Sequence, residues 1–205
     1  MNDQYTEEEE KFLSWFRENF KSMLIGLGAG IILVLTYKYY GDYQDEVTLN
    51  LSYEYQQAIK EYNSGNNKYL LEKDAKFSDK YPTHIYTNLI NLYAAKIYMN
   101  NKDIEKALNK LDFVIANTSS NHIKNISQIR KVRILISKNE LDSAFNLINK
   151  IDPKRENHIL IELLGDIYYK RGNIKLAKET YSHALQFNLT PNRLQIVENK
   201  LNTIQ

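Results

Sequence analysis

The side chains most suited to metal chemistry in this chain are its histidines. The four of them are scattered along the sequence, at His84, His122, His158 and His183. No two stand four residues apart and none lies in an HExxH pattern, so no helix face presents two imidazoles to a metal. We therefore interpret each as a surface or helix-packing residue.

One pair of carboxylates could serve acid–base chemistry. Glu162 and Asp166 lie one helical turn apart, which would place both side chains on one face of a helix. On the inner helix of a helical repeat, such a pair is typical of a solvated groove face. The sequence therefore predicts a protein that is not an enzyme, with no catalytic residue, no metal site and no cofactor.

Composition excludes several further classes. The 205 residues include no cysteine, which excludes disulfides, thiol catalysis and thiolate metal sites. The net charge is +2 with 25% charged residues, and no basic cluster with interleaved aromatics is present. A balance of this kind does not fit a nucleic-acid-binding protein.

One uncharged stretch, residues 22–37, decides whether the chain is anchored to a membrane. As a helix it measures about 24 Å, short of a hydrocarbon core of about 30 Å. Phe20 extends it, Lys21 and Lys38 can extend their charges to the lipid interface, and tyrosines follow as interfacial anchors. We predict a transmembrane helix over residues 21–40. Its core includes Met23, Gly26, Gly30 and Leu35.

Two alternatives compete with a transmembrane helix: a cleaved signal peptide and a buried helix of a soluble protein. The flanks disfavour a signal, because Glu7 to Glu10 precede the stretch and Tyr-Lys-Tyr-Tyr replaces a small-residue cleavage site. Gly26 and Gly30 form a GxxxG pattern that permits close helix packing. Simple filling of the bilayer explains the stretch equally.

The residues before the span, 1–20, read as an acidic and aromatic tail. Thr6 and Glu9 form a capping box that predicts a helix start. One apolar stripe follows, made of Phe12, Trp15, Phe16 and Phe20. We expect an amphipathic helix on the membrane surface, or else a short juxtamembrane helix without a partner. Three basic residues precede the span and one follows it, so the positive-inside rule places the N-terminus in the cytoplasm.

The rest of the chain, 41–205, has helical periodicity with internal repeats. In residues 158–191 the packing and turn positions of a 34-residue helix–turn–helix unit carry Leu164, Gly165, Tyr168, Gly172, Ala177, Tyr181 and Ala184. This stretch resembles a tetratricopeptide repeat. Weaker copies span about 88–121 and 125–157, because Ala107, Ala144 and Ala177 lie 37 and 33 residues apart. Asn139 replaces the turn glycine and tolerates the left-handed conformation.

These features predict an all-α chain: one N-terminal transmembrane helix followed by a tetratricopeptide-repeat-like solenoid. We expect degenerate helices over about 42–81 and a C-terminal cap over 192–205, since a solenoid needs atypical end units.

Binding is expected in a groove lined by the first helix of each repeat. The predicted lining residues are Leu89, Leu92, Lys96, Met99, Ile126, Ile129, Arg133, Ile136, Glu162, Asp166, Tyr169 and Lys170. About half of the aliphatic ones are expected to pack against neighbouring helices instead. Leu92 and Lys96 stand where Lys and Asn would grip a terminal carboxylate, which disfavours a fixed C-terminal peptide as ligand.

The layout as a whole resembles YfgM-type ancillary subunits of the bacterial SecYEG translocon. The resemblance rests on FxxWFxxNFKSMLIGLGAG, on the YKYY exit and on the SYEYQQAI helix. It implies a single-pass bacterial inner-membrane protein whose repeat domain faces the periplasm. The implied partners are the SecYEG channel, a PpiD-like periplasmic chaperone and non-native exported polypeptides. The alternative is an envelope or cell-division scaffold whose groove binds folded partner proteins.

Overall fold

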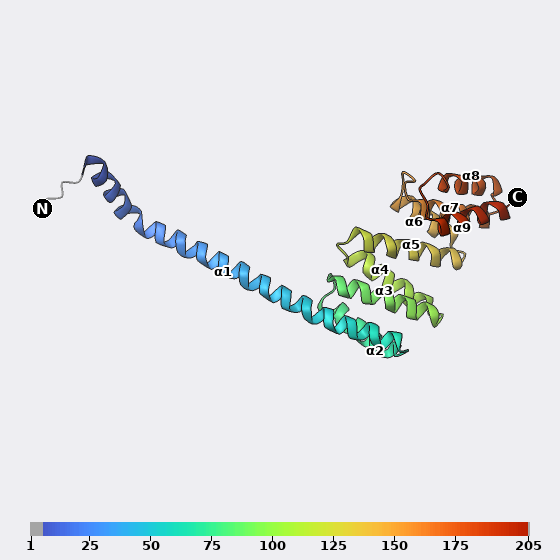
Figure 1. The fold of residues 1–205 in the computed structure, drawn as a ribbon, viewed down its shortest axis with the longest axis horizontal. Helices are drawn as coiled ribbons and strands as arrows, with labels where there is room; N and C mark the ends of the chain where they lie inside the picture. The colour runs from blue at the N-terminus through green and yellow to red at the C-terminus, as the bar shows by residue number, and fades with distance from the viewer. Residues whose placement is uncertain (1–5, 205) are drawn as a thin grey trace. The chain divides into compact units, whose positions relative to one another are not determined.

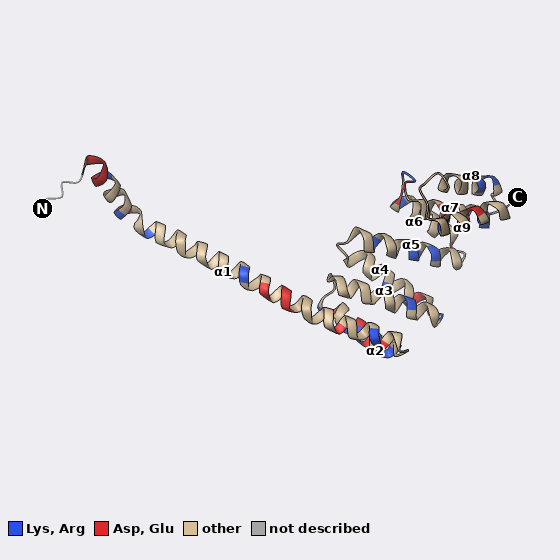
Figure 2. Cartoon of the chain, viewed as in Figure 1, with Lys and Arg blue, Asp and Glu red and all other residues tan. Residues whose placement is uncertain are grey.

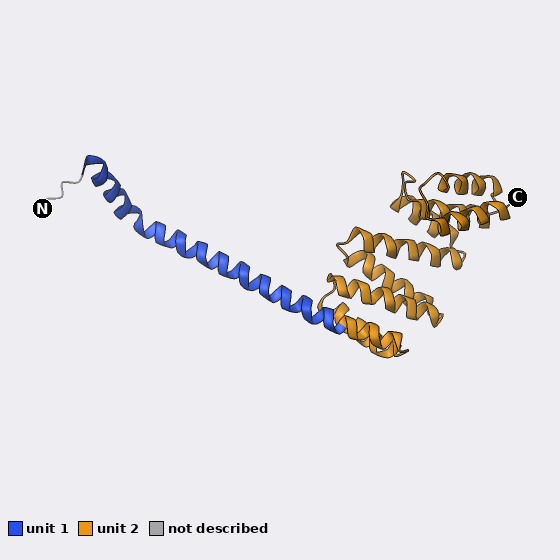
Figure 3. Ribbon diagram, in the orientation of Figure 1, with its two compact units in different colours: residues 1–54 blue, residues 55–205 orange. Residues whose placement is uncertain are grey.

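The computed structural model describes residues 6–204, and these residues form helices without any strand (Figure 1). In chain order they are α1 (Glu7–Asn63), α2 (Asn67–Lys80), α3 (Ile85–Asn100), α4 (Ile104–Asn117), α5 (Asn121–Ser137), α6 (Leu141–Ile151), α7 (His158–Lys170), α8 (Ile174–Ala184) and α9 (Pro191–Thr203). The predicted all-α class is confirmed. Two units, 1–54 and 55–205, divide the chain (Figure 3).

The first unit is formed by α1, whose start is set by the capping residues. The Thr6 N–H donates a hydrogen bond to Glu9 Oε2 at 2.6 Å, one half of the predicted capping box. This bond lowers the pKa of Glu9 from its ordinary value. The first turn holds four glutamates, red in Figure 2, where the helix dipole favours negative charge.

Within α1, residues 22–37 are uncharged and mostly apolar. Within residues 6–204, α1 is the one helix long and apolar enough to cross a membrane, and its apolar window is not buried. The exposed rings of Phe12, Phe16 and Phe20 form a ladder with centroids 6.3 and 5.4 Å apart. The segments predicted as tail, span and first soluble helix therefore lie on one uninterrupted helix.

The second unit is a stack of helix pairs in chain order. Helix α3 packs on α4, α5 on α6 and α7 on α8, while α4 contacts α5 and α6 contacts α7. Ahead of them, residues 55–63 pack on α2 and α3: the Tyr69 hydroxyl donates to Gln57, and the Tyr62 and Tyr93 rings lie 5.2 Å apart.

In the successive pairs α1–α2, α3–α4, α5–α6 and α7–α8, we call the first helix the inner helix and the second the outer helix. Each inner helix ends in the same turn. Gly65, Lys102, Asn139 and Gly172 all have positive φ, between 61° and 91°, and they are 37, 37 and 33 residues apart. At each turn the next residue's N–H bonds the carbonyl five residues back, as Asp103 does to Tyr98 at 2.9 Å. This is the Schellman motif. Asn139 takes the left-handed conformation that its residue type predicts.

Small or aliphatic residues then bring each outer helix against its partner. Five residues after each turn residue stand Leu70, Ala107, Ala144 and Ala177, all fully buried. Three of the outer helices also have a side-chain cap, on Asn66, Asp103 and Asn173. The repeat spacing predicted from the alanines is therefore the spacing of the turns and of the core.

Candidate protein-binding groove

Two hollows lie along the inner helices of the second unit. The first, here called the apolar pocket, has a volume of about 300 Å³ and lies between α3, α4 and α5. Its lining residues are Ala95, Lys96, Met99, Leu111, Arg130, Arg133 and Ile134. The apolar side chains belong to the core, whereas Lys96, Arg130 and Arg133 are exposed.

The second hollow, here called the charged pocket, has a volume of about 610 Å³ and lies between α5, α7 and α9. It is lined by Arg133, Ile136, Ser137, Glu162, Leu163, Asp166, Lys170, Arg193 and Lys200. Arg133 lines both pockets. The two hollows therefore adjoin at this residue.

Most of the predicted groove residues line these hollows. Lys96, Met99 and Arg133 line the apolar pocket, and five of the predicted residues line the charged pocket: Arg133, Ile136, Glu162, Asp166 and Lys170. Tyr169 is exposed and lines a smaller hollow of about 310 Å³ beside Lys200. These residues are on a common surface because the inner helices are stacked.

The remaining predicted residues point elsewhere. Leu92 is 7% exposed and belongs to the core between α3, α4 and α5, where Leu89 also packs. Ile129 packs against the next core cluster, and Ile126 is half-buried and lines none of the pockets described here. Even Ile136 is only 7% exposed, so it contributes little surface to the charged pocket.

The carboxylate pair of α7 is not solvated as its position suggested. Glu162 is 3% exposed, and Lys200 Nζ donates to Glu162 Oε1 at 2.6 Å and to both oxygens of Asp166 at 2.7 Å. Arg193 Nη2 lies 2.6 Å from Glu162 Oε2, close enough for an ion pair but without hydrogen-bond alignment. The C-terminal helix α9 therefore neutralises the pair.

Tyr181 of α8 completes this cluster. Its hydroxyl donates to Asp166 Oδ1 at 2.7 Å. Burial, together with the Asp166 carboxylate, raises the pKa of Tyr181 above its ordinary value. Each carboxylate of this cluster is therefore bound by a cation or a hydroxyl, and these bonds link α8 and α9 to α7.

Sequence reasoning missed the cations of this cluster. Lys200 lies 38 residues after Glu162, beyond any local spacing rule. A usable signal was present: Arg193 and Lys200 are seven residues apart, so they share one face of the predicted cap helix.

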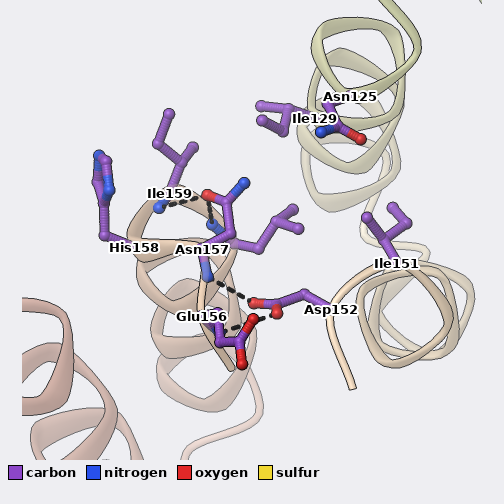
Figure 4. A pocket seen from close by; sticks show the side chains of 9 residues that line it. Asn125, Ile129, Ile151, Asp152, Glu156, Asn157, His158 and Ile159 are labelled. Atoms are coloured by element: carbon purple, nitrogen blue, oxygen red, sulfur yellow. Dashed lines mark hydrogen bonds between the residues drawn. The ribbon is translucent and has the colours of Figure 1, made fainter. Parts of the chain in front are cut away.

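A further hollow of about 440 Å³ lies beside the loop between α6 and α7 (Figure 4). Among its lining residues, Asp152 points at the loop and accepts hydrogen bonds from the N–H groups of Glu156 and Asn157 at 2.9 and 3.0 Å. Asn157 in turn caps α7 by accepting from Ile159 N–H. The Asp152 carboxylate and the Asn157 amide are therefore already engaged in building the loop.

No metal centre is evident in the part of the chain that the structure describes. Within residues 6–204, no three side chains of His, Cys, Asp or Glu are grouped so that they could hold a metal ion. The two pockets along the inner helices are the candidate binding surface.

Comparison with protein families matches residues 13–205 to the tetratricopeptide repeat-like domain model. The chain belongs to this family. The match includes the apolar part of α1 as well as the repeats, so the candidate span and the repeats lie within one family match. No solved structure matches it significantly.

Several relatives of this chain share one name, ancillary SecYEG translocon subunit. The relative from Aggregatibacter actinomycetemcomitans is 26% identical over 98% of this chain and 99% of its own length. The relative from Buchnera aphidicola (Acyrthosiphon pisum) is 28% identical over 85% of this chain and 88% of its own length. The Escherichia coli K12 relative is 21% identical over 93% of this chain and 91% of its own length. The resemblance to YfgM-type subunits is thus confirmed over the full layout.

Proposed function

We propose that this protein is a non-catalytic, membrane-anchored subunit that associates with the SecYEG translocon. The observation that carries the proposal is the combination, in one family match, of a candidate span in α1 with a repeat groove. Relatives that share the whole length bear the name of a translocon subunit. A groove whose acids are neutralised internally supports binding rather than catalysis.

The proposal includes an orientation and a task. The N-terminus lies in the cytoplasm, the helix crosses the inner membrane, and the second unit lies in the periplasm. There the groove binds newly exported, non-native polypeptides together with a PpiD-like chaperone. The anchor raises the local concentration of the groove at the channel exit, so weak contacts suffice.

The orientation can be tested because the chain has no cysteine. Single cysteines are introduced at two exposed positions, Ser14→Cys in the tail and Gln186→Cys after α8. A membrane-impermeant maleimide applied to spheroplasts should label Gln186→Cys and spare Ser14→Cys until the membrane is lysed. The reverse pattern would overturn the orientation.

The association is tested by isolating the full-length protein from membranes in mild detergent and identifying its partners. Recovery of the Sec channel is expected. Replacement of residues 21–40 by an unrelated span should keep the repeats folded and weaken that recovery. Unchanged recovery would assign the association to the second unit instead.

The second candidate function is an envelope or division scaffold that binds folded partners. The groove is compatible with such a scaffold. The two candidate functions differ in what the groove binds. A translocon subunit should bind chemically unfolded model polypeptides, whereas a scaffold should bind only a folded partner and should be isolated with division or envelope-synthesis proteins in place of the channel.

A further inference from the structure

The apolar pocket combines an apolar floor with a rim of one charge sign. Ala95, Leu111 and Ile134 are at most 7% exposed and form the floor, with half-buried Met99 beside them. The volume of about 300 Å³ is at the lower end of ligand pockets, which range over roughly 300–1,000 Å³. It suits one or two side chains of an extended polypeptide rather than a large ligand.

The rim is made by cations from two helices that contain no acid. Neither α3 nor α5 includes Asp or Glu, and Figure 2 shows α5 with Lys and Arg in blue and no red. Arg130 and Arg133 are exposed and lie three residues apart on one face of α5. Lys96 of α3 also lines the pocket, and its Nζ lies 5.7 Å from the centre of the Tyr62 ring.

Three acids on α2 and α4 are already paired with other lysines. Asp74 bonds Lys110 at 2.5 Å, Glu105 bonds Lys138 at 2.8 Å, and Asp112 bonds Lys131 at 2.5 Å. Among residues 6–204, no carboxylate forms an ion pair with Lys96, Arg130 or Arg133. The rim is therefore a set of exposed cations with which the carboxylates of a bound molecule can pair.

We propose that the apolar pocket binds polypeptide segments in which an aliphatic or aromatic side chain is flanked by carboxylates. The side chain enters the pocket over Met99 and Ile134, and the flanking acids pair with Arg130, Arg133 and Lys96. The inference rests on the proposed function, because it specifies which non-native segments the groove selects. Arginine guanidinium groups suit it, since they hold carboxylates in a bidentate fork.

The test uses full-length protein in mild detergent and fluorescein-labelled peptides that differ in one property. One peptide alternates leucine with glutamate, a second replaces each glutamate by glutamine, and a third replaces each leucine by serine. Binding is followed by fluorescence anisotropy. The first peptide should bind about tenfold more tightly than either control peptide, and its affinity should fall as salt is raised.

Matched protein variants separate the rim from total charge. The double variant Arg130→Gln, Arg133→Gln should weaken the acidic peptide about tenfold. The control Lys154→Gln, Lys175→Gln removes the same charge from exposed positions outside the groove and should leave the affinity unchanged. Each variant is also isolated with its membrane partners.

The outcomes distinguish this inference from the proposed function. Equal binding of the glutamate and glutamine peptides, with the Sec channel still recovered, overturns the inference alone. Self-association that is lost in the Arg130→Gln, Arg133→Gln variant also overturns it, because the occupant would then be a second copy. Absence of the channel from the isolated complexes overturns the proposed function instead.

Discussion

Gly165 of α7 lies directly against the ring of Tyr181 of α8: a Cβ built on Gly165 would come within 2.5 Å of Tyr181 Cε1. The ring cannot move away freely, because its hydroxyl is bonded to Asp166 and the residue is 2% exposed. The closeness of this helix pair therefore depends on the absence of one methyl group.

Replacing Gly165 by alanine should destabilise the third repeat. Overpacking of a filled core costs about 1–3 kcal/mol, and each kcal/mol lowers the melting temperature by about 2–4 °C in a chain of this size. Thermal unfolding of the full-length protein in mild detergent, followed by circular dichroism, measures the change. Gly41→Ala is the matched control, since its Cβ would meet open space; an equal loss in both variants would refute the packing argument.

The turn residue Lys102 should be a site of easy stabilisation. Its φ of 61° lies in the left-handed region, where a side chain costs roughly 1–2 kcal/mol. Lys102→Gly removes this cost from the folded state but also gives the unfolded chain more conformational freedom. The net gain in the free energy of unfolding should be about 0.5–1 kcal/mol. The reverse change at the equivalent turn, Gly172→Ala, should lower it, measured in the same unfolding experiment. A fall in stability for Lys102→Gly would contradict this assignment of strain.

The ion pair between Glu162 and Lys200 should carry a measurable coupling energy. Glu162→Gln and Lys200→Met are made singly and together, and their unfolding free energies form a double-mutant cycle. Because the Glu162 side chain is 4% exposed, we expect a coupling of about 1–3 kcal/mol. The surface pair Lys68–Glu72, with both side chains mostly exposed, supplies the comparison and should give less than about 0.5 kcal/mol. Similar values for the two pairs would mean that the Glu162–Lys200 pair adds no more to stability than an exposed pair, which would leave packing and the Lys200–Asp166 pair to hold α9.

His84 should make stability depend on pH. It is the N-cap of α3, its Nδ1 accepts from Tyr86 N–H at 3.3 Å, and burial lowers its pKa from the ordinary value of 6.5. The unfolded state therefore binds a proton that the folded state resists, so stability falls as the pH drops through 6.5 and below. A protonated imidazole would also lose the cap and place a cation at a helix start.

The His84 contribution is measured as the difference between the wild type and His84→Asn across that pH range. Asparagine keeps a capping oxygen but does not titrate. The wild type should lose more stability than the variant on acidification. Parallel curves for the two proteins would exclude His84 as the titrating group.

Local sequence rules predicted the features that repeat at short range. The buried Ala107, Ala144 and Ala177 gave the spacing of the outer helices, and Asn139 was recognised as a left-handed turn residue because asparagine tolerates that conformation. Lys102 was not recognised, since lysine carries no such preference. Its conformation follows from the Schellman bonds of the helix end rather than from its own side chain.

The groove was predicted less completely because helical periodicity identifies which residues share one face of a helix, but not which other helices pack against that face. Leu92 and Ile136 lie on the predicted face, yet the adjacent helices bury them. The partners of Glu162 come from α9, far along the sequence, so only the folded chain brings Arg193 and Lys200 to it. Arg130 was missed for a similar reason. It lies one turn from Arg133, and the pocket that both residues line forms only where α3 and α4 pack beside α5.

Helix α9 covers the last helix pair of the repeats, α7 and α8. In an array held together by contacts between neighbours, an uncovered last unit would be a template for stacking another repeat or another molecule. Here α9 packs on α8 and reaches the acids of α7 with Lys200. An incoming helix pair would have to break those ion pairs before it could stack. Ion pairs as well as packing therefore hold the helix that covers the α7–α8 pair.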